Sequence, residues 1–297
     1  MTKRLLLIAV MLVAVAVFLV VRARDLIPPS MSGGSEVELI PVPPPSVKLP
    51  ASPPVPATPI VEALDRAKPP FPDSVGRLLE RQFDWRSSPS TVNDYLLYLP
   101  ADLETEDKRW PVILYLHGRS LRGDDLSMLR RYGLPRYLAE GRDLPFIVVA
   151  PQLPDGQSWT DVDRLAALLE EVLARYPTDR DRVYLTGYSM GGRGVWRMAQ
   201  AYAGMFAAAA PLAAFTPAHS DAWTRALTGL PLRVYHGTAD EAAPFEGAAA
   251  MVTALRRNGV DAELRPYEGA DHGDLTRVYA EPTLYDWFLA HRRDPRL

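Results

Sequence analysis

Apolar residues along the chain gather in short continuous runs, which are typical of strands buried on both faces. In chain order, strands are expected over residues 92–99, 112–116, 146–150, 182–186, 207–212, 232–235 and 262–267. Helical spacing of apolar residues lies between or after them, over residues 163–176, 192–203, 245–258 and 277–290. Because strands alternate with helices, the pattern predicts an α/β fold with a doubly wound, mostly parallel sheet.

The N-terminal segment has a different pattern. An uncharged apolar run from Leu5 to Val21 follows Lys3 and Arg4, and arginines follow it. A helix of this length spans about 25 Å, slightly short of a ~30 Å hydrocarbon core. Residues 1–24 are therefore expected to be a signal anchor that binds the membrane through residues 5–21. A cleaved signal peptide is the alternative, although no small-x-small cleavage site follows.

A proline-rich stretch follows the apolar segment. Prolines recur from Pro28 to Pro59, and proline favours polyproline II and removes backbone donors. Residues 25–74 are therefore expected to be a semi-rigid linker, which leaves residues 75–297 as the folded catalytic domain. A domain tethered in this way is expected outside the cytoplasm, in the periplasm or the extracellular space, or secreted if the signal is cleaved.

Composition narrows the possible chemistry. The net charge is −3 with no basic stripe, so a nucleic-acid partner is not expected. The chain has no cysteine, which excludes disulfides, zinc–thiolate sites and thiol nucleophiles. No H-x-x-x-H spacing is present, so a zinc site is not expected. Oligomeric state is left open by the sequence.

A candidate nucleophile stands between an expected strand and an expected helix. Gly187-Tyr188-Ser189-Met190-Gly191 fits the G-x-S-x-G elbow, in which a serine occupies a strained turn and needs small neighbours two positions away. Alone, this pattern is common by chance and also describes an ordinary glycine turn. Directly after a strand and before a helix, it points to Ser189 as a nucleophile.

The serine needs a general base, and five histidines are available. His291 lies in the charged C-terminal tail, His219 in a polar loop, and His117 and His236 each end a strand. His272 lies late in the chain, in a glycine-flanked loop after the last expected strand. The order serine, acid, histidine that accompanies this elbow selects His272.

The acid should follow a strand between these two residues. Asp240 follows the strand that ends at residue 235, and the adjacent Glu241 is the rival. An oxyanion hole needs two preorganised donors. The backbone N–H of Met190 is expected to be one, and the backbone N–H of Arg119, on the loop after the strand over 112–116, the other. His117 is expected to support that loop rather than to react.

Four segments together resemble the α/β-hydrolases: LYLHGRSLRGDD, GYSMGGRGVWRMA, HGTADEAAPF and GADHG. More narrowly they resemble the esterase and predicted-peptidase group that includes polyhydroxybutyrate depolymerase-like and feruloyl-esterase-like enzymes. The resemblance covers about residues 90–290. It implies hydrolysis of a small carboxylic ester through an acyl-enzyme, with Ser189, Asp240 and His272 as the triad and no cofactor. Arg119 stands where such enzymes often have a small residue.

Other functions remain possible on the sequence. Dienelactone-hydrolase chemistry would need a cysteine nucleophile, and a dehalogenase would place aspartate at the elbow. A serine peptidase of the same fold is one alternative, although such peptidases usually carry a large gating domain. A non-catalytic module that binds a cell-envelope ligand is another, against which the complete triad argues.

Four arginines accompany the candidate site: Arg119, Arg122, Arg193 and Arg197. Arginine forks suit carboxylate geometry, so Arg193 and Arg122 are candidate substrate-binding residues for an ester that carries a negative group. The alternative is that these arginines pair with Asp124, Asp125 or other acids and only hold the loops.

Overall fold

The computed structural model describes residues 78–83, 93–103 and 108–293, which belong to a compact unit formed by Ala67–Leu297. The predicted anchor at 1–24 and the whole predicted linker at 25–74, with its boundary, lie outside the described residues. Within the described ranges, no helix combines the length and the apolar character that crossing a membrane requires.

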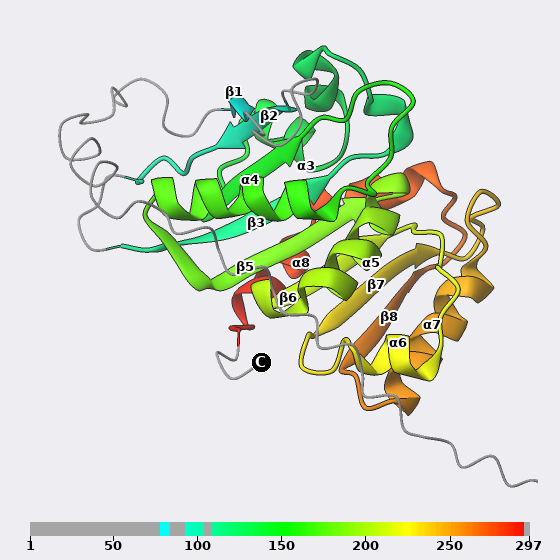
Figure 1. Ribbon diagram of the computed structural model, residues 1–297. Coiled ribbons are helices and arrows are strands. Elements are labelled where there is room, and N and C mark those ends of the chain that lie inside the picture. Colours follow the sequence, from blue (N-terminus) through cyan, green and yellow to red (C-terminus); the bar gives the residue numbers. More distant parts are fainter. Residues whose placement is uncertain (1–77, 84–92, 104–107, 294–297) are drawn as a thin grey trace, which may run out of the picture. The chain divides into compact units, whose positions relative to one another are not determined.

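The described residues form an eight-stranded sheet with the order β1-β2-β4-β3-β5-β6-β7-β8 (Figure 1). Strands β3 to β8 run parallel to one another, whereas β1 pairs antiparallel with β2, and β2 antiparallel with β4. The mostly parallel sheet predicted from the sequence is therefore confirmed. The strands are β1 Leu78–Phe83, β2 Asn93–Tyr98, β3 Trp110–Leu116, β4 Ile147–Pro151, β5 Thr178–Tyr188, β6 Ala208–Leu212, β7 Leu232–Gly237 and β8 Ala262–Tyr267.

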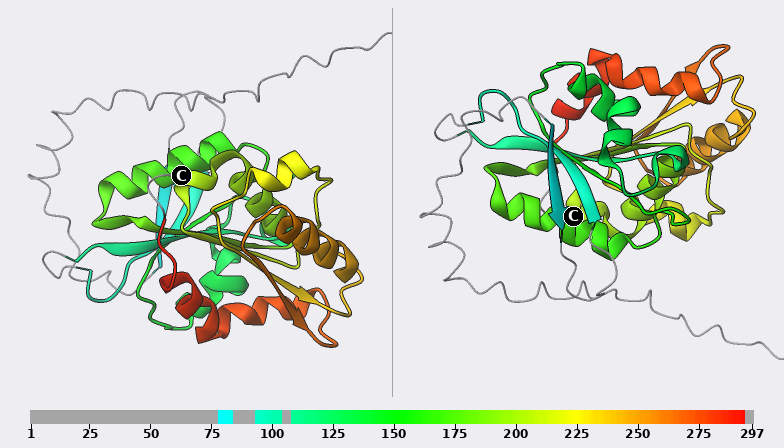
Figure 2. Two further views of the ribbon diagram at one scale, coloured as in Figure 1. Left: turned by 90° about the horizontal axis from the view of Figure 1, so that it is seen from below. Right: turned by 90° about the horizontal axis from the view of Figure 1, so that it is seen from above.

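Helices cover both faces of this sheet (Figure 2). The α-helices are α3 Gly133–Ala139, α4 Val162–Arg175, α5 Met190–Tyr202, α6 Asp221–Arg225, α7 Phe245–Arg257 and α8 Pro282–Leu289. Short 3₁₀ helices are η1 Arg119–Leu121, η2 Leu126–Arg131, η3 Ala203–Met205 and η4 Gly273–Ala280. One buried apolar cluster contains residues of α4, α5 and α7, and a second contains residues of α3, η4 and α8. Each cluster thus fills the space between the sheet and one helical layer.

The seven predicted strands and the first three predicted helices, which correspond to α4, α5 and α7, lie close to their predicted positions. The prediction of one helix over 277–290 is wrong. The segment is split into η4 and α8, and Glu281 between them is extended, with φ −87° and ψ 128°. Pro282 is the cause, because the residue before a proline is driven out of the helical region, while proline itself suits a first helical position.

The loop after β3 is held by His117, whose ring is fully buried. Nδ1 lies 2.7 Å from the Gly118 carbonyl oxygen, and Nε2 lies 3.0 Å from the Leu153 N–H. Because the carbonyl can only accept and the amide can only donate, Nδ1 carries the hydrogen and Nε2 accepts. The indole N–H of Trp159 donates to the His117 carbonyl at 2.9 Å. His117 therefore supports the loop, as the sequence suggested.

Burial lowers the pKa of His117 from 6.5 to about 4. Below pH 6.5 the unfolded chain takes up a proton at this ring that the folded protein does not take up until about pH 4. The free energy of unfolding should therefore fall as the pH drops through this window, by about 2 kcal/mol between pH 7 and pH 5 from this group alone.

We expect His117→Gln to remove this contribution. The variant will be less stable at pH 7, but its further loss of unfolding free energy on going to pH 5 should be about 2 kcal/mol smaller than that of the wild type. Urea unfolding at the two pH values measures the difference. His219→Gln, at an exposed ring, is the control and should keep the wild-type loss. Equal losses in the wild type and His117→Gln would contradict the assignment.

Candidate active site

Ser189 lies in the turn between β5 and α5, in a backbone conformation that few residues adopt. Its φ is 57° and its ψ −115°. For a non-glycine residue such a conformation costs on the order of 1–3 kcal/mol, so surrounding structure must impose it. The Ser189 N–H donates to the Leu212 carbonyl at 2.9 Å, and its carbonyl accepts from the Arg193 N–H at 3.1 Å. The turn is therefore tied to β6 on one side and to α5 on the other.

Close packing around this turn requires the glycines of the elbow. A Cβ on Gly191 would lie 1.8 Å from the Leu116 carbonyl oxygen, and one on Gly187 would lie 2.7 Å from the Gly191 backbone. Both contacts are with backbone atoms, which cannot swing aside as a side chain can. The spacing that identified the motif in the sequence is thus the spacing that the turn needs.

His272 stands at the start of η4, in the loop after β8, and faces the serine. Its Nε2 lies 2.9 Å from Ser189 Oγ, and its Nδ1 lies 2.8 Å from Asp240 Oδ2. The carboxylate can only accept, so Nδ1 carries the hydrogen and the lone pair of Nε2 is directed at the hydroxyl. This is the tautomer that a general base for the serine needs.

Asp240 follows β7 and is buried beneath the histidine. Its side chain is fully buried, and its Oδ1 accepts from the N–H groups of Ala242 at 3.0 Å and Ala243 at 2.8 Å. Its other oxygen binds His272. The rival Glu241 is exposed, and the contact with His272 is made by Asp240.

The three side chains come from loops at the carboxyl ends of β5, β7 and β8, which run parallel in one sheet. Carboxyl ends of parallel strands share one edge of the sheet, where ligands commonly bind. Residues 83 positions apart in the chain are therefore brought within hydrogen-bonding distance. The structure brings together the three residues that the sequence selected.

The two expected oxyanion donors lie at the starts of helices. Met190 is the first residue of α5 and Arg119 the first residue of η1. The N–H groups of a first helical turn have no partner within their own helix. The loop before η1 lies against the elbow, because a Cβ on Gly118 would stand 3.2 Å from the Tyr188 ring. The role of the Met190 and Arg119 N–H groups in binding an oxyanion stays a prediction.

The arginines near the site differ in what they contact. Arg122 donates to the carbonyls of Arg119 at 3.1 Å and Gln157 at 3.0 Å. Arg197 donates to the Trp159 carbonyl at 3.2 Å. Both therefore hold loops, through backbone carbonyls rather than through acids. Arg193 is exposed.

Two groups that the sequence did not single out for the site contact His272 and Asp240. The Tyr188 hydroxyl donates to the His272 carbonyl at 2.9 Å, and burial raises the pKa of Tyr188 to about 12, so the hydroxyl stays protonated. The His236 ring lies 3.4 Å from Asp240 Oδ2. In the sequence, only their positions could have pointed to these two residues, since Tyr188 directly precedes Ser189 and His236 stands four residues before Asp240.

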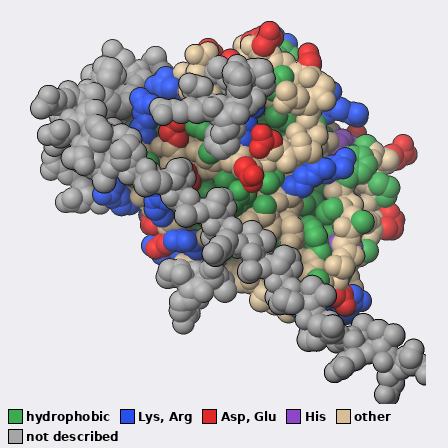
Figure 3. Space-filling model, in the orientation of Figure 1, with side chains coloured by type: hydrophobic (Ala, Val, Ile, Leu, Met, Phe, Trp, Pro, Cys, Tyr) green, Lys and Arg blue, Asp and Glu red, His purple; other side chains and the backbone are tan. Residues whose placement is uncertain are grey.

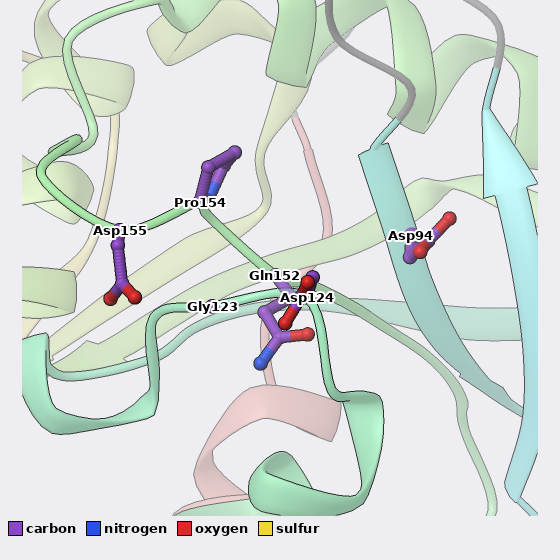
Figure 4. A pocket seen from close by; sticks show the side chains of 6 residues that line it. All are labelled: Asp94, Gly123, Asp124, Gln152, Pro154 and Asp155. Atoms are coloured by element: carbon purple, nitrogen blue, oxygen red, sulfur yellow. The ribbon is translucent and has the colours of Figure 1, made fainter.

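A hollow of about 260 Å³ lies elsewhere on the molecule and contains none of the three residues. Figure 4 shows the side chains around it, which come from β2, the loop after β4 and the loop between η1 and η2: Asp94, Gly123, Asp124, Gln152, Pro154 and Asp155. Gln152 donates to the carbonyls of Leu121 at 2.9 Å and Asp125 at 3.0 Å, and so ties these loops together. Among the residues with described positions, no group of three or more histidines and acids could hold a metal ion.

Charged side chains on the face shown in Figure 3 are interspersed with apolar ones where described residues form the surface. Neither sign gathers into one broad patch on this visible part. The face therefore does not present the single-sign field that attracts a highly charged partner.

Residues 151–281 match the model of the dienelactone hydrolase family. This stretch contains Ser189, Asp240 and His272. Dienelactone-hydrolase chemistry was not expected, because it needs a cysteine nucleophile and the chain has none. The match concerns the sequence pattern of the family and does not conflict with that expectation, since the elbow of this chain carries a serine. No curated protein matches the chain significantly in sequence.

Solved structures share the fold. One is a thermostable esterase with 24% identity and a TM-score of 0.62, aligned over 74% of this chain and 64% of that one. Another is a ferulic acid esterase from Anaeromyces mucronatus, with 18% identity, a TM-score of 0.54, and 72% and 90% coverage. A third is the acylaminoacyl peptidase of Pyrococcus horikoshii, with 14% identity, a TM-score of 0.55, and 73% and 42% coverage.

The chain spans less than two thirds of the thermostable esterase and less than half of the peptidase. Identities this low carry over the fold and not the substrate. The strand order and these structural neighbours show that the described residues have an α/β-hydrolase fold, and residues 151–281 resemble the dienelactone hydrolase family in sequence.

Proposed function

We propose that the protein is a serine hydrolase that cleaves small carboxylic esters through an acyl-enzyme. The observation that supports this is the unbroken chain of contacts from Ser189 Oγ to His272 at 2.9 Å and from His272 to Asp240 at 2.8 Å. A hydroxyl that meets a neutral imidazole, itself oriented by a buried carboxylate, is the arrangement that activates serine.

In the first half of the reaction, Ser189 Oγ attacks the ester carbonyl carbon while its proton passes to His272 Nε2. Asp240 stabilises the imidazolium that forms, and the N–H groups of Met190 and Arg119 bind the oxyanion. The intermediate collapses, the C–O bond to the alcohol breaks, and Nε2 returns the proton to the departing oxygen. Water then attacks the acyl-enzyme by the same steps, which releases the acid and restores Ser189.

A serine peptidase is the second candidate, because the acylaminoacyl peptidase of Pyrococcus horikoshii shares the fold. The present chain covers 42% of that protein, so most of the peptidase has no counterpart in the alignment. Ester hydrolysis is therefore the function we favour over peptide hydrolysis.

Selection of anionic esters by Arg193 and attachment to a membrane through residues 5–21 stay predictions. Arg193 is the better candidate of the two substrate-binding arginines, because Arg122 already donates to two carbonyls. Location outside the cytoplasm is proposed on the same N-terminal segment.

Ser189→Ala should abolish labelling by a fluorophosphonate probe and lower kcat for an activated ester by about 10⁴-fold or more. The reason is that the alanine cannot form the acyl-enzyme. Circular dichroism and urea unfolding should show an intact fold, and Ser158→Ala, at an exposed serine, should label and turn over like the wild type. Labelling of the Ser189→Ala variant would refute the nucleophile, and an unlabelled, inactive wild type would favour a binding module.

Asp240→Asn and Glu241→Gln separate the two acids. The first should lower kcat by about 10⁴-fold, because the amide cannot stabilise an imidazolium and favours the wrong tautomer of His272. The second should leave kcat within about twofold, since Glu241 is exposed and the described contact to His272 comes from Asp240. Steady-state kinetics on one activated ester give both values. A larger loss in Glu241→Gln than in Asp240→Asn would move the acid to Glu241.

A further inference from the structure

A second histidine contacts the acid of the proposed triad. His236 lies at the end of β7, and its ring is fully buried. Its Nε2 is 2.6 Å from the Ala243 carbonyl oxygen and 3.4 Å from Asp240 Oδ2. That carboxylate oxygen is the one that binds His272 Nδ1. The two histidine rings therefore meet the acid at the same atom.

The contacts of His236 define where its hydrogen lies. A carbonyl oxygen can only accept, so the short contact with Ala243 requires a hydrogen on Nε2. Nδ1 is buried and has no hydrogen-bond partner in the described part of the chain. A hydrogen there would be a buried donor without an acceptor, which is costly. The ring thus acts as a donor through Nε2 alone, and Phe245 packs against its edge with ring centroids 6.2 Å apart.

Ala243 connects this ring to the carboxylate from the other side. Its N–H donates to Asp240 Oδ1 at 2.8 Å, while its carbonyl accepts from His236. The ring consequently holds the Ala243 backbone on its carbonyl side, one peptide group beyond the N–H that holds Oδ1. At the same time its Nε2–H places a positive dipole end near Oδ2, at a distance too long for a strong hydrogen bond but close enough for electrostatic attraction.

We propose that His236 is a positioning residue, which holds the Asp240 carboxylate in the orientation that aligns His272 with Ser189. It touches neither substrate nor the reacting atoms and acts through Asp240 and the turn over residues 240–243. The inference rests on the proposed serine hydrolase function. It goes beyond it by assigning a second histidine to the site, in a role that the order of residues along the chain does not indicate.

The test compares two variants that keep different properties of the ring. His236→Phe keeps the volume and removes the donor, whereas His236→Gln keeps an N–H at about the reach of Nε2 and loses the ring. We expect kcat for an activated ester to fall on the order of tenfold or more in the phenylalanine variant, with KM within about twofold, and to stay within about threefold of wild type in the glutamine variant.

The opposite order would overturn the proposal. If the ring only fills space in the core, phenylalanine will be tolerated and glutamine will damage the enzyme. Equal and full activity of both variants would overturn it as well. Active sites are counted by the stoichiometry of fluorophosphonate labelling, so that kcat refers to folded protein. If His236→Phe does not fold, His236→Leu serves as the second variant without a donor.

A double-mutant cycle tests whether His236 acts through the acid. In an Asp240→Asn background, where the carboxylate is already lost, His236→Phe should change kcat by less than about twofold. A further loss as large as that in the wild-type background would show an independent, structural effect and would contradict the proposal.

A spectroscopic reading does not depend on turnover. In the ¹⁵N spectrum of the imidazoles, His272 should keep its hydrogen on Nδ1 in the wild type and in His236→Gln, and should become a mixture of tautomers in His236→Phe. An unchanged His272 spectrum in His236→Phe would overturn the inference. Failure of the proposed function itself is recognised separately, by full activity of Ser189→Ala.

Discussion

The site depends on how closely α5 approaches the sheet. The Gly191 Cα lies so near the Leu116 carbonyl that a Cβ would stand 1.8 Å from its oxygen, and a Cβ on Gly192 would stand 2.6 Å from the Ala214 side chain. Only a chain without side chains at these positions can turn this sharply from β5 into α5. The sharp turn forces Ser189 into its unusual conformation and places its hydroxyl at the carboxyl edge of the sheet. Every other feature of the site is arranged around that hydroxyl.

Several contacts hold the loop that carries His272 next to Ser189 and β7. The hydroxyl of Tyr188, one residue before Ser189, donates a hydrogen bond to the His272 carbonyl. Gly237 lets the loop before His272 pass close to β7, because a Cβ there would lie 2.2 Å from the Ala270 carbonyl oxygen. The same sheet edge thus fixes His272 and Asp240 relative to Ser189. Small residues make these approaches possible, and backbone hydrogen bonds keep them in place.

Much of this arrangement could be predicted from the sequence, because the elements that matter most leave strong local signals. The continuous apolar runs of β3, β4 and β5 are buried on both faces, and the elbow needs glycine at fixed positions. The weaker signals were missed: β1, at the sheet's edge, is buried only at its two end residues, with half-buried and exposed residues alternating between them, and α3 and α6 are short. Contacts such as that of His236 with Asp240 depend on side-chain packing and on the turn over 240–243, which no periodicity reports.

Burial and hydrogen-bond partners distinguish His272, the proposed base, from the two histidines at strand ends. His117 and His236 each follow or end a strand before a glycine, and both rings are fully buried, with Nδ1 or Nε2 donating to a backbone carbonyl. A proton added to the His117 ring would need an acceptor at Nε2, which meets only the Leu153 amide N–H. The His272 side chain is instead 24% exposed, and its second nitrogen meets a hydroxyl that can give up a proton. With a buried carboxylate on its other side, His272 has the surroundings that the proposed general base needs.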